Sequence, residues 1–167
     1  MSISYDELAE IYEELYGPEQ FPKNLAVAVL VKGAEKILDA GCGTGMLESL
    51  LDASTYHVCL DLSYNMLRRY TLTRRRGGDP LVGDMRMPPL RCCFDAVVAV
   101  TSIHEAPEAA DALASLVKEG GLFVLTVKEG LPRPKDPGNA VLVKKLKSGR
   151  EEILVYRVTA STRSARR

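Results

Sequence analysis

The sequence has no tryptophan, only two histidines and no long apolar run. No stretch approaches the roughly 20 apolar residues that a membrane-spanning helix needs. The N-terminal segment MSISYDELAEIYEELYG is acidic and lacks the apolar centre of a signal peptide. The 22 basic and 22 acidic residues balance, so net charge favours neither nucleic acid nor an anionic membrane as a partner. We therefore expect a cytoplasmic protein without membrane contact.

Cysteine is scarce and irregularly spaced. Cys42, Cys59, Cys92 and Cys93 form no Cys-x2-Cys pair, so no structural zinc site or other metal site is expected. In a chain without signs of secretion, these cysteines are expected to be reduced thiols. The adjacent pair Cys92-Cys93 could be redox-active, but two small buried residues at the entry to a strand is the favoured interpretation.

What is present is typical of one globular domain. Apolar residues make up 46% of the 167 residues and charged residues 26%. Apolar runs such as DAVVAV and LFVLTV predict strands buried on both faces, as in a parallel sheet covered by helices. Right-handed crossovers then give an α/β fold with a doubly wound sheet. Strands are predicted at 36–40, 56–60, 80–83, 94–101 and 122–128. Helices are predicted at 21–32, 46–51, 64–75 and 107–118, and a first helix, capped by Ser4 or Asp6, ends at 16 before a Gly-Pro break.

The last segment differs in kind from the rest. VLVKKLKSGREEILVYRV contains two strand-like runs around Ser148-Gly149, which predicts an antiparallel hairpin. The preceding LPRPKDPGNA is a proline-rich loop with no room for a helix.

Three glycines follow the first predicted strand in ILDAGCGTGML, residues 37–47. Gly41, Gly43 and Gly45 let the turn adopt positive φ and let a ligand approach bare backbone. The helix that follows would offer unpaired N–H groups at its start. One glycine-rich turn is weak evidence by itself, because tight packing between strand and helix can also require glycine.

Carboxylates accompany this loop at three successive strand ends: Asp39, Asp61 and Asp84. Asp61 could accept hydrogen bonds from both hydroxyls of a ribose, although Asp61 or Ser63 could instead cap the next helix. Asp84 could accept from an exocyclic amino group, or it could be an ordinary loop residue. Together the three acids favour a ligand at the carboxyl edge of the sheet.

Five segments resemble, in their order and spacing, the motifs of class I S-adenosylmethionine-dependent methyltransferases. They are ILDAGCGTG, the acid of CLDLSYNML, VGDMRMPPL, FDAVVAVTSIHEA and LVKEGGLFVLTV. The resemblance runs from about residue 5 to the final hairpin. It implies S-adenosylmethionine as the cofactor and a Rossmann-like methyltransferase fold, with a mostly parallel seven-stranded sheet whose last strand inserts antiparallel. The C-terminal hairpin suits that fold.

The resemblance also implies a set of cofactor-binding residues along these motifs. The methionine portion is then held by Asp39, Gly41, Cys42, Gly43, Thr44 and Gly45. Asp61 would hold the ribose, Leu62 would pack against the adenine, and Asp84 with Met85 would address its edge. The stretch from Thr101 to His104 would border the sulfonium methyl. The helix at 5–16 resembles one that closes over the cofactor.

We therefore expect one methyltransferase domain over residues 1–167. Within it, 1–34 form an N-terminal helical cap and 35–130 the cofactor-binding core. Residues 131–160 form a loop with the terminal hairpin, and 161–167 a tail. A dinucleotide is the main rival ligand, but its G-x-G-x-x-G spacing differs from the tighter G-x-G-x-G present here.

His104 is the best candidate for a general base, because its unperturbed pKa lies near neutrality. Glu105 could serve instead. Equally, His104 could be a hydrogen-bonded loop residue, and Glu105 an acid favoured by a helix dipole. Methyl transfer needs mainly in-line positioning and exclusion of water, with a base only where the nucleophile is protonated.

The methyl acceptor is not identified by the sequence, and a small molecule is favoured. After the strand predicted at 94–101, TSIH replaces the N-P-P-[YF] run that would indicate methylation of an exocyclic amine. The end of that strand also has no cysteine, which argues against the covalent mechanism of cytosine-C5 methylation. A basic run at 74–76 and a second basic cluster of the tail arginines with Lys144, Lys145 and Lys147 keep RNA or another nucleic acid as a less favoured acceptor. A protein acceptor also stays open. The short chain predicts a thin roof, so a homodimer, a partner subunit or a large acceptor could cover the cleft. A noncatalytic S-adenosylmethionine-binding or scaffold subunit is the alternative.

Overall fold

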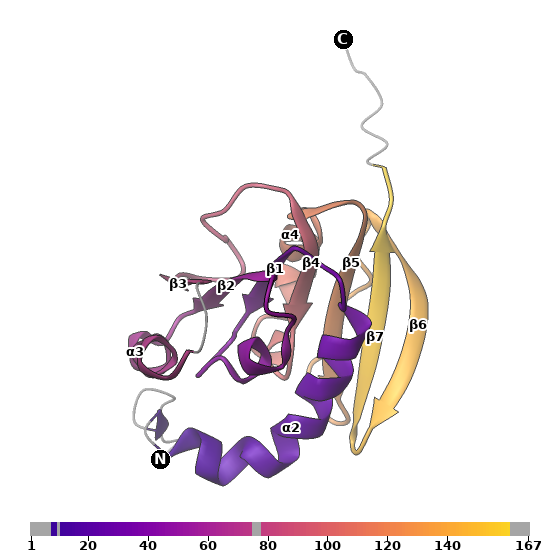
Figure 1. Ribbon diagram of the computed structural model, residues 1–167. Helices are drawn as coiled ribbons and strands as arrows, with labels where there is room; N and C mark the ends of the chain where they lie inside the picture. The colour runs from indigo at the N-terminus through magenta and orange to yellow at the C-terminus, as the bar shows by residue number, and fades with distance from the viewer. Residues whose placement is uncertain (1–7, 10, 75–77, 161–167) are drawn as a thin grey trace.

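The computed structural model describes residues 8–9, 11–74 and 78–160 (Figure 1). The described strands form one sheet in the order β3-β2-β1-β4-β5-β7-β6. β1 to β5 are parallel, and β7 is antiparallel to both β5 and β6. The predicted α/β fold with a doubly wound, mostly parallel sheet and a terminal hairpin is thus confirmed. The strands are β1 (Lys36–Ala40), β2 (Tyr56–Asp61), β3 (Gly78–Val82), β4 (Phe94–Ala99), β5 (Val117–Lys128), β6 (Ala140–Ser148) and β7 (Glu151–Val158).

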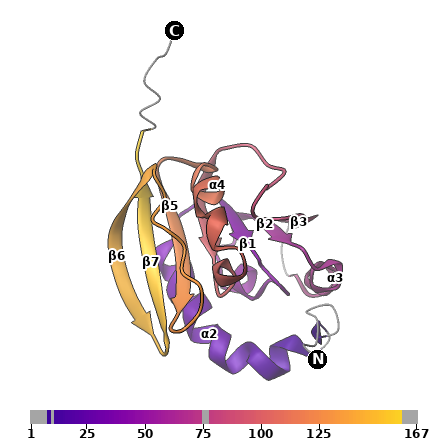
Figure 2. The same cartoon turned by 180° about the vertical axis from the view of Figure 1, so that it is seen from behind.

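Helices cover both faces of the sheet (Figures 1 and 2). They are α2 (Tyr12–Leu30), α3 (Tyr64–Thr73) and α4 (Ala110–Ala114), with 3-10 helices η1 (Met46–Leu50), η2 (Ile103–Glu105) and η3 (Pro107–Ala109). Successive strand residues point to opposite faces. Val97 of β4 therefore packs in a cluster with Leu113 of α4, whereas Val98 packs in a second cluster with Val27 of α2 and Leu47 of η1.

The N-terminal helix differs from its prediction. α2 runs through Pro18 and Pro22 without a break, and Figure 1 shows it bending beneath the sheet. Each proline removes one intrahelical hydrogen bond, which kinks a helix but need not end it when one of its faces is packed. The buried residues of α2 recur at helical spacing: Gln20, Lys23, Asn24, Val27 and Ala28. The predicted break at Gly17 is therefore wrong. The predicted caps Ser4 and Asp6 lie outside the described residues.

The helix predicted at 107–118 is also much shorter than expected. Only one turn of 3-10 helix and the short α4 form, because β5 already begins at Val117, which pairs with Phe94 of β4. Burial of Val117 in the core favours strand pairing over the helical pattern. The predicted helix at 46–51 is the 3-10 helix η1, and α3 agrees with its prediction to within two residues of its end.

The four cysteines are joined in disulfides, Cys42 to Cys59 and Cys92 to Cys93, so the expectation of reduced thiols is wrong. Cys42 follows β1 directly and Cys59 lies in the neighbouring β2, which brings their Cα atoms to 5.5 Å. Cys92 and Cys93 are exposed in the loop before β4 rather than buried as predicted.

The hairpin forms as expected, with its turn at Gly149 and Arg150 between β6 and β7. β7 contributes Leu154 and Tyr156 to one core cluster and Ile153 and Val155 to the other. It is therefore an interior strand with both faces buried. Among the helices within the described ranges, none combines the length and apolarity needed to cross a membrane.

Candidate functional site

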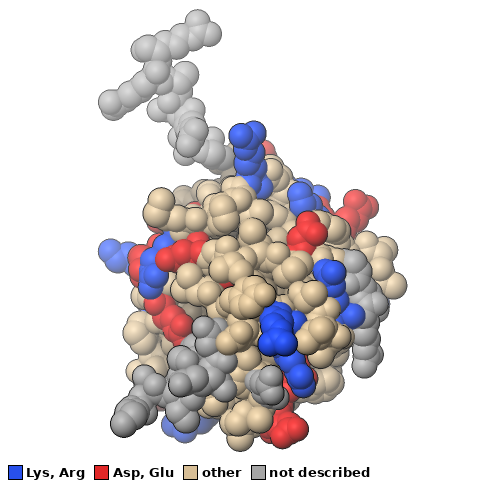
Figure 3. Space-filling model, turned by 90° about the vertical axis from the view of Figure 1, so that its left-hand side faces the viewer, with Lys and Arg blue, Asp and Glu red and all other residues tan. Residues whose placement is uncertain are grey.

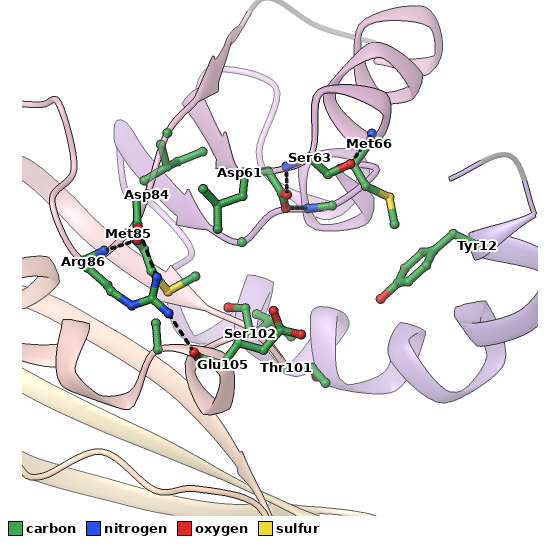
Figure 4. Close-up of a pocket in the computed structure, with 17 residues that line it drawn as sticks. Tyr12, Asp61, Ser63, Met66, Asp84, Met85, Arg86, Thr101, Ser102 and Glu105 are labelled. Carbon is green, nitrogen blue, oxygen red and sulfur yellow. Dashed lines mark hydrogen bonds and ion pairs between the residues drawn. The ribbon is translucent and has the colours of Figure 1, made fainter. Parts of the chain in front are cut away.

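A cavity of about 330 Å³ opens at the carboxyl ends of the parallel strands (Figure 4). Its walls come from the loops after β1, β2, β3 and β4 and from Tyr12 of α2. This is the edge at which open α/β sheets bind ligands, because the strand order reverses between β1 and β4. A volume of this size suits a small organic molecule.

The three glycines of the first loop all have positive φ, but they face different surroundings. A Cβ on Gly41 would lie 2.4 Å from the Cβ of Ser102, and one on Gly45 would lie 2.2 Å from the ring of Tyr70. A Cβ on Gly43, where φ is +56°, would meet no atom within 4 Å. Gly41 and Gly45 are therefore required by packing, whereas Gly43 leaves bare backbone beside an open space.

Asp61 ends β2 and fastens this loop. Its Oδ2 accepts a hydrogen bond from the N–H of Gly43 at 2.8 Å, and its Oδ1 accepts one from the N–H of Ser63 at 2.8 Å. Burial raises the pKa of Asp61, and the negative charges of Asp39 and Glu105 raise it further, against the effect of these two hydrogen bonds. The carboxylate thus lies at the cavity wall, and no cationic side chain within the described ranges forms an ion pair with it.

The helix after β2 is capped by a different residue. Ser63 Oγ accepts a hydrogen bond from the N–H of Met66 at 3.1 Å and is the N-cap of α3. Asp61 is therefore not needed as the cap. Of the two residues that the sequence allows as the cap of this helix, Ser63 has that role.

The opposite wall is built around Arg86. Its backbone N–H and its guanidinium both donate to Asp84, at 2.9 and 3.0 Å. The guanidinium also donates to Glu108 at 2.6 Å. It donates as well to the carbonyl of Glu105 at 3.2 Å (Figure 4). The hydrogen bond from the Arg86 backbone holds the pKa of Asp84 below its usual value. Arg86 thus joins the loop after β3 to the loop after β4.

Tyr12 of α2 and Glu105 of η2 approach the cavity from different elements. Both side chains point toward the space between Asp61 and Ser102 (Figure 4). Burial, with nearby negative charges, raises the pKa of Tyr12 to about 12. Its phenol is therefore neutral at physiological pH. Neither Tyr12 nor Arg86 was a predicted site residue, because a tyrosine in an amphipathic helix and an arginine in a loop carry no motif.

Most of the predicted site residues line this cavity: Gly41, Gly43, Asp61, Leu62, Asp84, Met85, Thr101 and Glu105. Asp39, Cys42 and Thr44 instead line an adjoining cavity of about 40 Å³, which shares Tyr12, Gly41 and Gly43 with the first. Gly45 and His104 are described but line neither of these two cavities.

Asp39 and His104 are two of the predicted residues that do not line the cavity of about 330 Å³. Asp39 is 3% exposed, and its Oδ2 lies 3.6 Å from Nε2 of the buried His57. His104 Nε2 lies 3.9 Å from Oε1 of Glu105, beside the large cavity but not on its wall. Of the two candidate bases, Glu105 therefore has direct access. The described part of the chain holds no group of three or more His, Cys, Asp or Glu side chains placed to bind a metal ion.

Comparisons with known proteins agree with this architecture. A family model described as a methyltransferase domain matches residues 38–125. No curated protein sequence matches the chain. A chain from the complex between the Haloferax volcanii Trm112 methyltransferase activator and a methyltransferase aligns with a TM-score of 0.77 at 14% identity, covering 93% of this chain and 96% of that one.

Other solved structures share the fold. An S-adenosylmethionine-dependent methyltransferase from Clostridium acetobutylicum has a TM-score of 0.71 at 14% identity, covering 93% of this chain and 99% of that one. Magnesium protoporphyrin IX methyltransferase from Synechocystis, solved with bound SAM, has a TM-score of 0.62 at 15% identity, covering 95% and 86%.

Proposed function

The chain belongs to the class I S-adenosylmethionine-dependent methyltransferases, and we propose that it binds S-adenosylmethionine in the large cavity and passes its methyl group in line to a small-molecule acceptor. The observation that carries the proposal is the open space in front of Gly43, next to the half-buried carboxylate of Asp61. Bare backbone beside an acceptor of hydrogen bonds fits a ribose whose two hydroxyls need partners.

The other walls suit the remaining parts of the cofactor. Leu62 is 64% exposed at the cavity, and Met85 is half-buried opposite it, so the two provide apolar surfaces for a flat base. Asp84, held by Arg86, offers acceptor oxygens at the base's edge. The smaller cavity, lined by Asp39, Cys42 and Thr44, extends from the same loop and would take the methionine portion.

When bound, the sulfonium supplies an already activated methyl group, so the protein's task is to orient it and exclude water. Glu105 points into the cavity and is our candidate for accepting a proton from the acceptor (Figure 4). Tyr12, a neutral donor, closes the cavity from the side of α2. His104 would act only after its side chain turned toward the cavity.

Three features support a small-molecule acceptor over RNA. On the face shown in Figure 3, basic and acidic side chains are interspersed rather than gathered by sign. Lys145 of the second basic cluster pairs with Glu152 at 3.1 Å, so a neighbouring carboxylate offsets its charge. Among the charged residues that line the cavity, three are carboxylates (Asp61, Asp84 and Glu105) and one is a cation (Arg86), a balance that repels phosphates.

We retain the division into a cap (1–34), a cofactor core (35–130), a loop with the hairpin (131–160) and a tail (161–167), together with a cytoplasmic location, as part of this proposal. The cap packs through α2 against η1 and the sheet. The division predicts that removing the cap exposes the cavity without removing Asp61 or Gly43.

Thermal denaturation with added ligands tests the cofactor assignment. S-adenosylmethionine and S-adenosylhomocysteine should each raise the melting temperature, whereas NAD should not. A shift with NAD alone would overturn the assignment. Transfer of a labelled methyl group to a panel of metabolites then tests the reaction.

A second candidate function is that of a subunit that needs a partner chain for activity. It is favoured by the exposed apolar side chain of Leu62, which lines the cavity and is 64% exposed. It is also favoured by the structural similarity to a chain from a complex with a methyltransferase activator. Cofactor binding without methyl transfer to any metabolite, followed by transfer when lysate is added, would favour this candidate.

A further inference from the structure

Lys23 of α2 and Glu151 of β7 form an ion pair in the interior of the protein. The two residues are 2% and 3% exposed, and Lys23 Nζ lies 2.5 Å from Glu151 Oε1. Removing two charges from water costs about as much free energy as their attraction returns, so such a pair is weak evidence for a role in stability. A different role is indicated by the third group in the cluster.

That third group is Thr101, in the turn that follows β4. Its Oγ1 accepts a hydrogen bond from Lys23 Nζ at 3.0 Å. The same hydroxyl lies 3.1 Å from Glu151 Oε2 and 3.2 Å from Gln20 Oε1. Because a hydroxyl has one proton, it can donate to only one of these oxygens at a time. The side chain is thus held by α2 and β7 together.

The backbone of Thr101 explains why holding it matters. Its φ is +54°, the left-handed region, and among the described residues other than glycine it alone has a positive φ. A β-branched residue adopts this conformation only when its surroundings impose it. Here its N–H donates to Thr126 Oγ1 at 2.8 Å while its side chain is fixed by the ion pair.

The conformation of this turn shapes the cavity. Val100, Thr101 and Ser102 all line it. Ser102 Oγ donates a hydrogen bond to the carbonyl of Ala40 at 2.7 Å. The Cβ of Ser102 lies so close to Gly41 that a Cβ on Gly41 would be only 2.4 Å from it. A relaxation of Thr101 toward ordinary backbone angles would therefore move Ser102 and, through it, the start of the glycine loop.

We infer that Lys23 and Glu151 are positioning residues for methyl transfer: they hold the Thr101 turn in its strained conformation and thereby set the affinity of the cavity for its cofactor. The inference rests on the proposed function, since it assumes that the large cavity holds S-adenosylmethionine. Neither residue lines that cavity, so an effect on binding is indirect: it passes through Thr101 or through the attachment of α2, which supplies Tyr12 to the cavity wall.

The test compares the double variant Lys23→Met/Glu151→Leu with wild type. Replacing both charges by apolar side chains avoids leaving one buried charge unpaired, so the fold should be kept, with a melting temperature close to that of wild type or above it. Calorimetric titration with S-adenosylhomocysteine should show binding weakened about tenfold, as expected for the loss of a hydrogen bond from a charged donor.

A matched control is provided by Glu19 and Lys128. This pair, 3.0 Å apart and more exposed, also ties α2 to the sheet but does not contact Thr101. Glu19→Leu/Lys128→Met should change the affinity less than about twofold. An equal loss in the control variant would overturn the inference, because tethering of α2 would then be sufficient.

Thr101→Val tests the same link without touching the charges. It keeps the shape of the side chain but removes the hydroxyl, and it should weaken S-adenosylhomocysteine binding about as much as the double variant. Thr101→Ser restores the hydroxyl and should recover most of the affinity. Wild-type affinity in Thr101→Val, or in a folded Lys23→Met/Glu151→Leu, would overturn the inference. Failure of the wild-type protein to bind S-adenosylhomocysteine would instead overturn the proposed function.

Discussion

The two sides of the cavity are held together in different ways. On the side of β1, β2 and β3, Asp61 bonds the backbone of Gly43, only 18 residues away in the chain. On the side of β4, β5 and β7, Lys23 bonds Thr101 and Glu151, which are 78 and 128 residues away. The first side uses local backbone contacts with open space beside them, and the second uses a buried ion pair and a hydroxyl group from three distant elements.

Because of this difference, substitutions on the two sides should affect different properties, ligand affinity on one side and the free energy of unfolding on the other. Contacts on the first side lie at the cavity wall, where a ligand can add to them, so changes there should act mainly on affinity. Contacts on the second side are removed from solvent, where unpaired charge is costly, so single changes there should act mainly on the free energy of unfolding. Four measurements can break or sharpen this division.

The largest effect is expected from Lys23→Met. It leaves the carboxylate of Glu151 buried without its cation and should lower the free energy of unfolding by about 3–5 kcal/mol. Urea denaturation measures this loss. The control Lys128→Met removes a more exposed partner and should cost less than about 1 kcal/mol. If the two variants lose the same free energy of unfolding, the buried position of the Lys23–Glu151 pair does not make its disruption more costly.

Alanine at two glycines of the same loop should act differently. Gly45→Ala sets a Cβ against the ring of Tyr70, which is 1% exposed and contacts His57 at 3.2 Å. Together with the positive φ, this should cost roughly 2–5 kcal/mol of stability.

Gly43→Ala meets no protein atom and should cost only about 1–2 kcal/mol, from its backbone conformation. Its added methyl group lies in the open space, so it should weaken S-adenosylhomocysteine binding more than its effect on stability suggests. Denaturation and calorimetry on both variants check the contrast, and an unchanged affinity for Gly43→Ala would show that the space is not used.

Asp61→Ala should weaken cofactor binding by about 1–3 kcal/mol, since hydrogen bonds to a charged acceptor are lost. Asp95 offers a matched control, because it also accepts two backbone N–H groups, from Glu35 at 3.0 Å and from Lys36 at 2.7 Å, but lies away from the cavity. Calorimetry should find Asp95→Ala close to wild type in affinity. If both variants bind equally well, Asp61 has only a structural role.

The smallest effect concerns pH. Because burial raises the pKa of Asp61, this group takes up its proton at a higher pH than an ordinary aspartate. Protonation removes an acceptor for ribose hydroxyls, so affinity should fall as pH falls through this raised pKa, by at most about tenfold per pH unit.

The contribution of the same group to stability has the opposite sign. A raised pKa in the folded state means that the folded protein binds the proton more tightly than the unfolded chain, so this group destabilises the fold at neutral pH and ceases to do so on acidification. Asp61→Asn should flatten the pH dependence of affinity. A profile unchanged by that substitution would assign the titration to another group.

The same contrast governs what the sequence could predict. The strands, the glycine loop and Asp61 follow from local patterns: apolar runs, positive-φ residues and an acid at a strand end. The sequence allows either Asp61 or Ser63 as the cap of α3, and only the geometry assigns the cap to Ser63.

The long-range side could not be predicted. Lys23 and Gln20 make the buried face of α2 polar, so the apolar period that would have carried the helix through Pro18 is missing. Nothing in the local sequence of Glu151 marks it as buried, because its partner comes from the opposite end of the described chain. The disulfide between Cys42 and Cys59 likewise depends on two neighbouring strands rather than on spacing.

The place of β7 in the sheet bears on how the protein assembles during synthesis. β7 emerges from the ribosome after β6, yet it lies between β5 and β6. A nascent chain halted before residue 151 therefore has β6 without its neighbour, an open edge on β5 and an internal ammonium group without its counter-ion. Insertion of this strand completes the sheet and the strained turn in one event, so the protein gains its mature cavity only after β7 has been synthesised.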